Sequence, residues 1–146
     1  MLDKLFEYLN VREEERTQVW LMLGAGFFMG TFLATYGVVA ESLFLSTLGN
    51  QLNQAFFYSG LFGIAATSIF SFVQTRIKFS NLTSATITLI VALTAFFYVG
   101  YHFGPSRYKE PIIFTMFCMI GPITTVLLLS YWGVFGRLFN FRQSKR

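Results

Sequence analysis

Four long apolar stretches set the strongest limit on how this chain can fold. They occupy residues 19–45, 55–74, 82–101 and 111–132 of the 146-residue sequence. A bilayer core about 30 Å thick is crossed by about 20 apolar residues in a helix that rises about 1.5 Å per residue. Each stretch is long enough for one crossing, so we expect lipid and neighbouring helices to surround most of these side chains.

The composition excludes a water-soluble globule with a charged shell. The chain is 54% hydrophobic and 12% charged, whereas a typical soluble domain is about 25% charged. All 11 Lys and Arg residues lie outside the four stretches, and Glu41 is the one acid within them. Backbone groups in lipid must be paired, and the alternation typical of barrel strands is not visible. The predicted fold class is therefore all-α, an integral membrane bundle of four transmembrane helices.

The positions of the basic residues predict the topology. Cytoplasmic loops and ends of membrane proteins carry an excess of Lys and Arg. After four crossings, both termini and the loop before residue 82 share one side, which holds nine of the 11 bases; the other side holds Arg107 and Lys109. We therefore expect both termini in the cytoplasm, with a bacterial inner membrane or another plasma membrane as the location.

The two ends of the chain differ from the predicted transmembrane domain, residues 17–136. Residues 1–16 are expected to form a short cytoplasmic interfacial helix, and residues 137–146 a basic cytoplasmic tail. Apolar side chains recur at helical spacing near the N-terminus, as an interfacial helix requires; they are Leu2, Leu5, Phe6 and Leu9.

Small residues in the first two spans indicate helix packing. Gly26, Gly30 and Ala34 follow one another every four residues along the first span, and Gly60 and Gly63 lie in the second. Because apolar burial does not drive helices together in lipid, close backbone approach at small residues matters more. We expect these positions to form contact surfaces, either within the chain or between chains.

The last two spans carry polar residues and a proline. Gly121 and Pro122 lie in the middle of the fourth span, where proline removes a helical hydrogen bond and predicts a kink. Thr83 and Thr86 are hydroxyl residues of the third span, and Thr124 follows the kink. These hydroxyls either bond to carbonyls of their own helix or form a polar wall that faces an aqueous cavity.

Glu41 is the one ionisable residue inside an apolar stretch. A carboxylate within a bilayer is costly, and it marks a candidate functional site. Two interpretations remain open: Glu41 emerges at the outer interface, where water hydrates it, or it faces the bundle interior as a proton- or cation-coupling group.

No motif of an enzyme is visible. Ser, His and acidic residues show no catalytic spacing, and there is no glycine-rich phosphate loop. The single cysteine, Cys118, excludes an internal disulfide and any site built on paired cysteines. The bases are divided among four short segments, which excludes a nucleic-acid-binding face. We therefore expect no catalytic residues, no metal site and no cofactor.

Three short segments resemble a known family of carriers. They are residues 12–15 before the first span, residues 42–45 after it, and residues 139–146, which follow Trp132 at the end of the fourth span. Together they are similar to the N-terminal four-span part of nucleotide (ATP/ADP) translocase-like carriers of the major facilitator type. The resemblance implies the first third of a twelve-span carrier with cytoplasmic ends.

Alternating access needs two halves that move about a central site, so four spans imply a fragment, a reduced descendant or a subunit completed by other chains. We expect a transporter-like membrane module or an N-terminal fragment of one, in which Glu41, the third-span hydroxyls and the kink share one cavity. The alternative is a non-catalytic structural or assembly subunit, with Gly26 and Gly30 at a protein contact. A membrane sensor is a third interpretation. The expected partners are the bilayer and other membrane chains or further copies of this chain.

Overall fold

The computed structural model describes the backbone of residues 13–143 and the side chains of residues 16–137. The predicted interfacial segment, residues 1–16, and the predicted basic tail, residues 137–146, lie largely outside these described residues.

All regular structure in the described part of the chain is helical, which confirms the all-α prediction. The long helices have the bounds α2 (Glu13–Leu48), α3 (Leu52–Gln74), α4 (Phe79–Phe103), α5 (Lys109–Cys118) and α6 (Ile120–Gln143). Two short 3-10 turns connect them, η1 (Gly49–Gln51) between α2 and α3 and η2 (Ser106–Tyr108) before α5. The helices cover the four predicted spans and extend beyond them at most ends.

Three helical stretches among the described residues are long and apolar enough to cross a membrane. Their bounds are Arg16–Gln74, Phe79–Phe103 and Ser106–Arg137. The first has 59 residues and contains two α-helices, α2 and α3, which η1 joins. The division of this stretch into two separate crossings stays a prediction.

The chain forms two compact units, residues 1–32 and residues 33–146. The described part of the first unit is the N-terminal portion of α2. In this portion the Thr31 hydroxyl donates to the carbonyl of Phe27 at 2.9 Å, one helical turn earlier. All the structural features that follow belong to the second unit.

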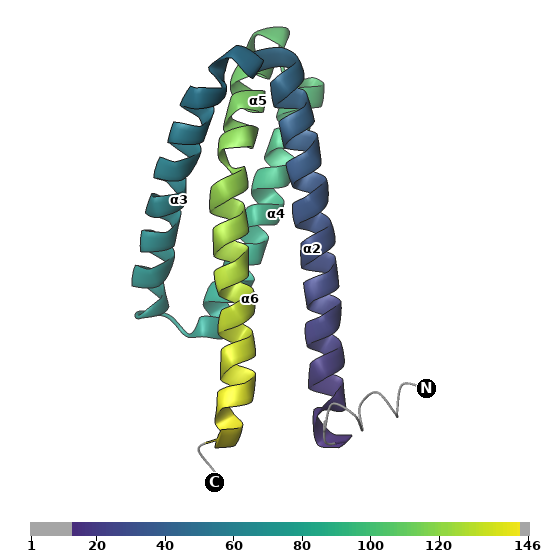
Figure 1. Cartoon of the computed structure of the whole chain (residues 1–146), viewed down its shortest axis with the longest axis vertical. Helices are drawn as coiled ribbons and strands as arrows, with labels where there is room; N and C mark the ends of the chain where they lie inside the picture. Colours follow the sequence, from purple (N-terminus) through teal and green to yellow (C-terminus); the bar gives the residue numbers. More distant parts are fainter. Residues whose placement is uncertain (1–12, 144–146) are drawn as a thin grey trace. The chain divides into compact units, whose positions relative to one another are not determined.

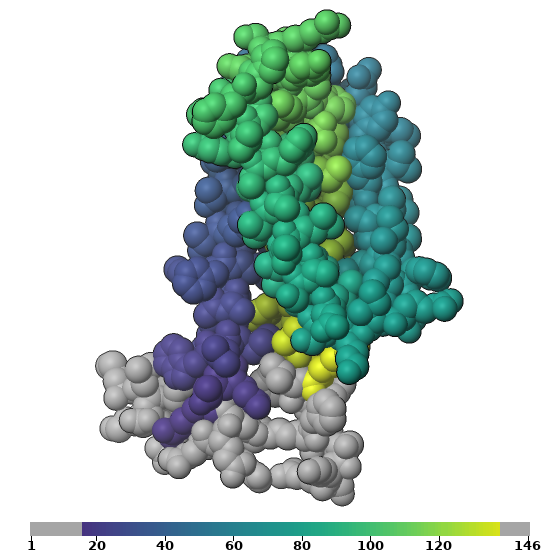
Figure 2. Space-filling view, turned by 180° about the vertical axis from the view of Figure 1, so that it is seen from behind, coloured from purple at the N-terminus to yellow at the C-terminus, as the bar shows by residue number. Residues whose placement is uncertain are grey.

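Helices α5 and α6 occupy the centre of the second unit. Both contact α3 and α4, and in the space-filling view α6 is visible between these two helices (Figure 2). Most of the buried side chains of the second unit lie on α4, α5 and α6. The ribbon view shows α3 running back from the end of α2, beside α6 (Figure 1).

An apolar cluster joins α2, α3 and α5. Its buried members are Phe44, Leu48, Ala55, Ile113, Phe117 and Cys118. The rings of Phe44 and Phe117 are stacked, with their centroids 4.2 Å apart, an arrangement that adds to the energy of burial alone. Cys118 and Ala55 are both small and fully buried, so α5 and α3 approach each other closely at this point.

A second cluster joins α3, α4 and α6 near the loop between α3 and α4. Phe70, Phe79 and Leu82 are its buried members. Gly133 of α6 lies against the ring of Phe79: an added Cβ atom at Gly133 would overlap Cζ of this ring and lie 2.9 Å from its Cε2 atom. The ring therefore occupies the space that the missing side chain leaves.

Large apolar side chains point outward from α3 and α4. Ile64 of α3 is 70% exposed, and Val91, midway along α4, is 60% exposed. Monomeric soluble proteins rarely expose large continuous apolar surfaces. The outer faces of α3 and α4 are therefore suited to contact with lipid.

We expect the substitution Gly133→Ala to destabilise the protein. The new methyl group would press on the buried ring of Phe79, and such overpacking typically costs about 1–3 kcal/mol. Gly136→Ala, one turn later on α6, is the matched control because no atom lies within 4 Å of its added Cβ. Thermal unfolding followed by circular dichroism in detergent should show a lower midpoint for Gly133→Ala alone. An equal or higher midpoint for Gly133→Ala than for Gly136→Ala would contradict this packing.

Candidate functional site

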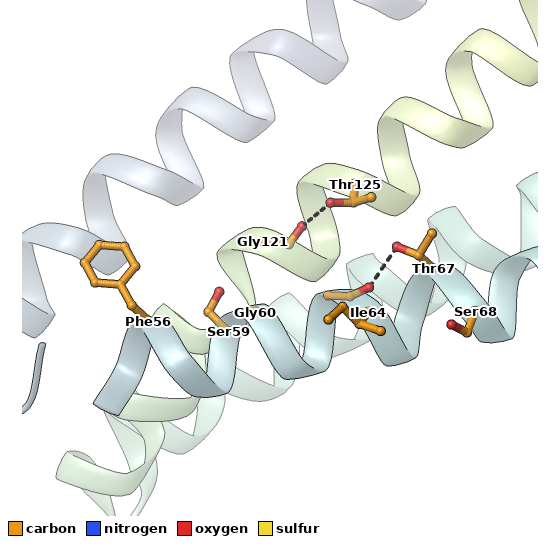
Figure 3. Close-up of a pocket in the computed structure, with 9 residues that line it drawn as sticks. Phe56, Ser59, Gly60, Ile64, Thr67, Ser68, Gly121 and Thr125 are labelled. Atoms are coloured by element: carbon orange, nitrogen blue, oxygen red, sulfur yellow. Dashed lines mark hydrogen bonds between the residues drawn. The ribbon is translucent and has the colours of Figure 1, made fainter. Parts of the chain in front are cut away.

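An open groove of about 570 Å³ lies between α3 and α6. Its α3 wall includes Phe56, Gly60, Gly63 and Thr67, which recur at the three- and four-residue spacing of one helix face. Gly121 and Thr125 of α6 form the opposite wall, and the close-up shows their positions across from α3 (Figure 3).

The glycines of the groove affect the spacing between α3 and α6 in two different ways. No atom lies within 4 Å of a Cβ added at Gly60 or Gly63, so their missing side chains leave open space. Gly121 instead allows a close approach, because an added Cβ would lie 2.9 Å from the hydroxyl oxygen of Ser59. Helix α6 therefore approaches α3 closely at Ser59, and the groove is open over Gly60 and Gly63.

The hydroxyls of the groove are bonded to their own helices. Thr67 donates to the carbonyl of Gly63 at 2.8 Å, and Thr125 donates to the carbonyl of Gly121 at 2.9 Å (Figure 3). None of the described lining residues is charged. This surface contains neither a nucleophile with an adjacent base nor a pair of ionisable groups, so it is suited to packing or to binding a weakly polar molecule.

A second cavity, of about 360 Å³, lies between α3, α4 and α6. Most of its lining is apolar, with Phe70, Leu89 and Ile123 among the side chains. Thr86 and Pro122 also line it, and the Thr86 side chain is buried. This cavity brings one third-span hydroxyl beside the proline of the fourth span.

The fourth predicted span is interrupted at Met119, between α5 and α6. Pro122 follows three residues later and has no N–H to offer the carbonyl of Cys118. Helical bonding continues on both sides: the Met119 N–H donates to Thr115 at 3.0 Å, and the Ile123 N–H donates to Met119 at 3.0 Å. The interruption thus lies within one turn of the Gly121–Pro122 pair at which the sequence predicts a kink.

Two side-chain hydrogen bonds connect the end of α5 to neighbouring helices near this interruption. The hydroxyl of Tyr36, on α2, donates to the carbonyl of Met116 in a buried hydrogen bond of 2.9 Å. The thiol of Cys118 donates to the carbonyl of Ala55 at 3.6 Å. The last carbonyls of a helix lack partners within it, so Tyr36 ties the end of α5 to α2. This role of Tyr36 was not predicted from the sequence, although a tyrosine hydroxyl inside an apolar span indicates that a buried partner exists.

Neither of the two cavities contains all of the polar residues predicted from the sequence. Glu41 is exposed on α2, and Thr124 is half-buried on α6; neither lines either of the two cavities. Thr86 lines the apolar cavity. Thr83 is half-buried, and its hydroxyl has no hydrogen-bond partner among the described residues.

The predicted packing residues lie in both units. Gly26 and Gly30 belong to the first unit, whereas Ala34 is exposed on the part of α2 in the second. Gly60 and Gly63 line the groove. A contact between these small residues and another helix stays a prediction.

The described residues contain no group of three or more His, Cys, Asp or Glu side chains that could hold a metal ion. Comparison of the chain with protein-family models, with curated proteins and with solved structures gives no match.

We expect Tyr36→Phe to lower stability, because the substitution removes the donor to the Met116 carbonyl and leaves the ring in place. Hydrogen bonds between membrane helices contribute about 0.6 kcal/mol on average and up to about 1.7 kcal/mol. Tyr98→Phe is the matched control, since Tyr98 is exposed on α4. Unfolding in mixed micelles should show a smaller free energy for Tyr36→Phe and an unchanged one for Tyr98→Phe. Equal free energies for Tyr36→Phe and the unsubstituted protein would refute the role of this bond.

Proposed function

We propose that this chain is an integral membrane protein with four spans, formed by α2, α3, α4 and the pair α5–α6. The exposed apolar side chains of α3 and α4 support this proposal, as does the reversal of the chain at η1, Gly49–Gln51. Both termini lie in the cytoplasm, on the side with the larger number of bases. A bacterial inner membrane or another plasma membrane is the proposed location.

Within the membrane, the proposed function is that of a transporter-like module of the major facilitator type that is completed by further helices. The open groove between α3 and α6 is the observation that carries this proposal. Gly60 and Gly63 form part of its α3 wall, and their missing side chains leave open space in it. The remaining helices of a carrier-type assembly would face this groove and enclose it as a water-filled path.

A non-catalytic structural or assembly subunit is the second candidate. The hydrogen bonds of the groove hydroxyls favour this candidate, because Thr67 and Thr125 donate to carbonyls of their own helices. A conducting path requires polar or charged groups that face it, and Glu41 lines neither described cavity. In this case the groove holds a partner helix and carries no substrate.

Single cysteines in a Cys118→Ala background test both candidates. Gly60→Cys places a thiol in the groove, and Ala65→Cys places one on the opposite face of α3, where Ala65 is exposed. Five residues separate the two positions, so they differ little in depth, by about 7.5 Å along the helix. The protein is labelled in native membranes with a water-soluble thiol reagent and then tested for cross-linking.

The transporter-like module predicts that Gly60→Cys reacts at least about tenfold faster than Ala65→Cys with the water-soluble reagent, because water enters a transport path. The assembly subunit predicts that Gly60→Cys resists the reagent and instead cross-links to a second chain. Equal behaviour of the two variants would show that the groove faces lipid, and this result would overturn both candidates.

A further inference from the structure

Arg137 of α6 lies beside Phe79, directly after the loop between α3 and α4 that carries two further cations. The guanidinium carbon of Arg137, on α6, lies 4.1 Å from the centroid of the Phe79 ring. Phe79 directly follows Lys78, and Arg76 lies two residues earlier in the same loop. The side chains of Arg76, Lys78 and Arg137 are all exposed. The contact with Phe79 therefore brings a cation of α6 to the cations of the loop.

These cations lie at the ends of the apolar stretches. One stretch ends at Gln74 and the next begins at Phe79, and Arg137 is the first charged residue that follows Glu110 along the chain. Arg76 also lies over an aromatic ring, with its guanidinium carbon 5.4 Å from the centroid of Phe72. Phe72 is 64% exposed on the apolar surface of α3. This side chain pair places an apolar ring toward lipid and a cation toward the headgroups, as residues at a membrane boundary do.

The two ends of the second unit differ in their acidic residues. No Asp or Glu occurs in residues 42–109 or in residues 111–137. Glu110 lies in the first turn of α5, beside Lys109 and far along the chain from Arg137. Glu41 lies one turn before Phe44, which packs against α5 as well. The two described acids of this unit, Glu41 and Glu110, therefore belong neither to the loop between α3 and α4 nor to α6.

We propose that Arg76, Lys78 and Arg137 bind the phosphate of an anionic phospholipid headgroup. A guanidinium presents a planar fork of N–H donors that fits phosphate oxygens. The two guanidinium groups lie over the rings of Phe79 and Phe72, which carry no charge that would neutralise them. Basic residues between helices at the cytoplasmic boundary recognise anionic lipids. The exposed ring of Phe72 adjoins the site and favours a lipid, with its acyl chains, over a free anion.

This inference rests on the proposed membrane location, and the test distinguishes failure of the lipid site from failure of that location. The full chain, purified in an uncharged detergent, is titrated with short-chain phosphatidylglycerol, with phosphatidylcholine of the same chain length and with inorganic phosphate. The shift of the thermal unfolding midpoint is measured against the midpoint of each variant without additive. The variants are Arg76→Gln/Arg137→Gln and, because Arg137 also contacts Phe79, Lys78→Gln alone.

The matched control is Arg107→Gln/Lys109→Gln, which removes the same charge from the other end of the helices. We expect a saturable shift with phosphatidylglycerol and a half-saturation concentration about tenfold or more higher for Arg76→Gln/Arg137→Gln, since each base near an anionic lipid contributes substantially to binding. Lys78→Gln should raise this concentration severalfold, and the control should leave it within about twofold.

Three results would overturn the inference: an equal shift with phosphatidylcholine, a full shift with inorganic phosphate alone, or equal weakening in the control. The shift with inorganic phosphate would indicate a site for free anions. Extraction of membranes with alkaline carbonate tests the membrane location separately. A chain that stays in the membrane without preferring phosphatidylglycerol overturns only the lipid site, whereas a chain that is washed off overturns the proposed function as well.

Discussion

Helices in hydrocarbon gain little from burying apolar side chains against one another, because lipid tails are equally apolar. The packing of this chain is consistent with that constraint. Its central helices meet their neighbours where one partner is small: Cys118 meets Ala55, Gly121 meets Ser59, and Gly133 meets Phe79. The first two contacts bring backbones close and the third seats a ring against a backbone, so dispersion and specific hydrogen bonds hold the bundle together while many large side chains face outward.

The need for close approach at small residues also suggests a role for the open groove of the second unit. The groove over Gly60 and Gly63 is a small-residue surface like the ones that pack α6 against α3, yet no helix of the described chain fills it. Its satisfied hydroxyls make it better suited to receive a helix than to coordinate an ion. Most of the charged residues lie instead outside the apolar stretches, where the proposed membrane arrangement would place them among headgroups and water.

Much of the fold could be predicted from the sequence, because helix class and approximate span limits depend on local hydrophobicity. The interruption near Pro122 was also predictable, since proline acts on its own helix. The roles of Gly133 and Tyr36 were not, because each depends on which residue of another helix lies opposite. For the same reason, Gly60 and Gly63 could be identified as packing residues, but not assigned to an open groove. Glu41 could be singled out by its charge, whereas its exposure depends on how α2 is turned.

The central claim is that lipid surrounds the outward faces of these helices, and a spin label on α4 tests it most directly. Val91 lies midway along α4 and is exposed. A label at Val91→Cys, in a Cys118→Ala background in reconstituted bilayers, should collide often with oxygen, which concentrates in hydrocarbon, and rarely with a water-soluble nickel chelate. A label at Lys78→Cys, beyond the end of the span, should show the reverse. Frequent collisions of the Val91→Cys label with the nickel chelate would contradict a membrane-embedded bundle.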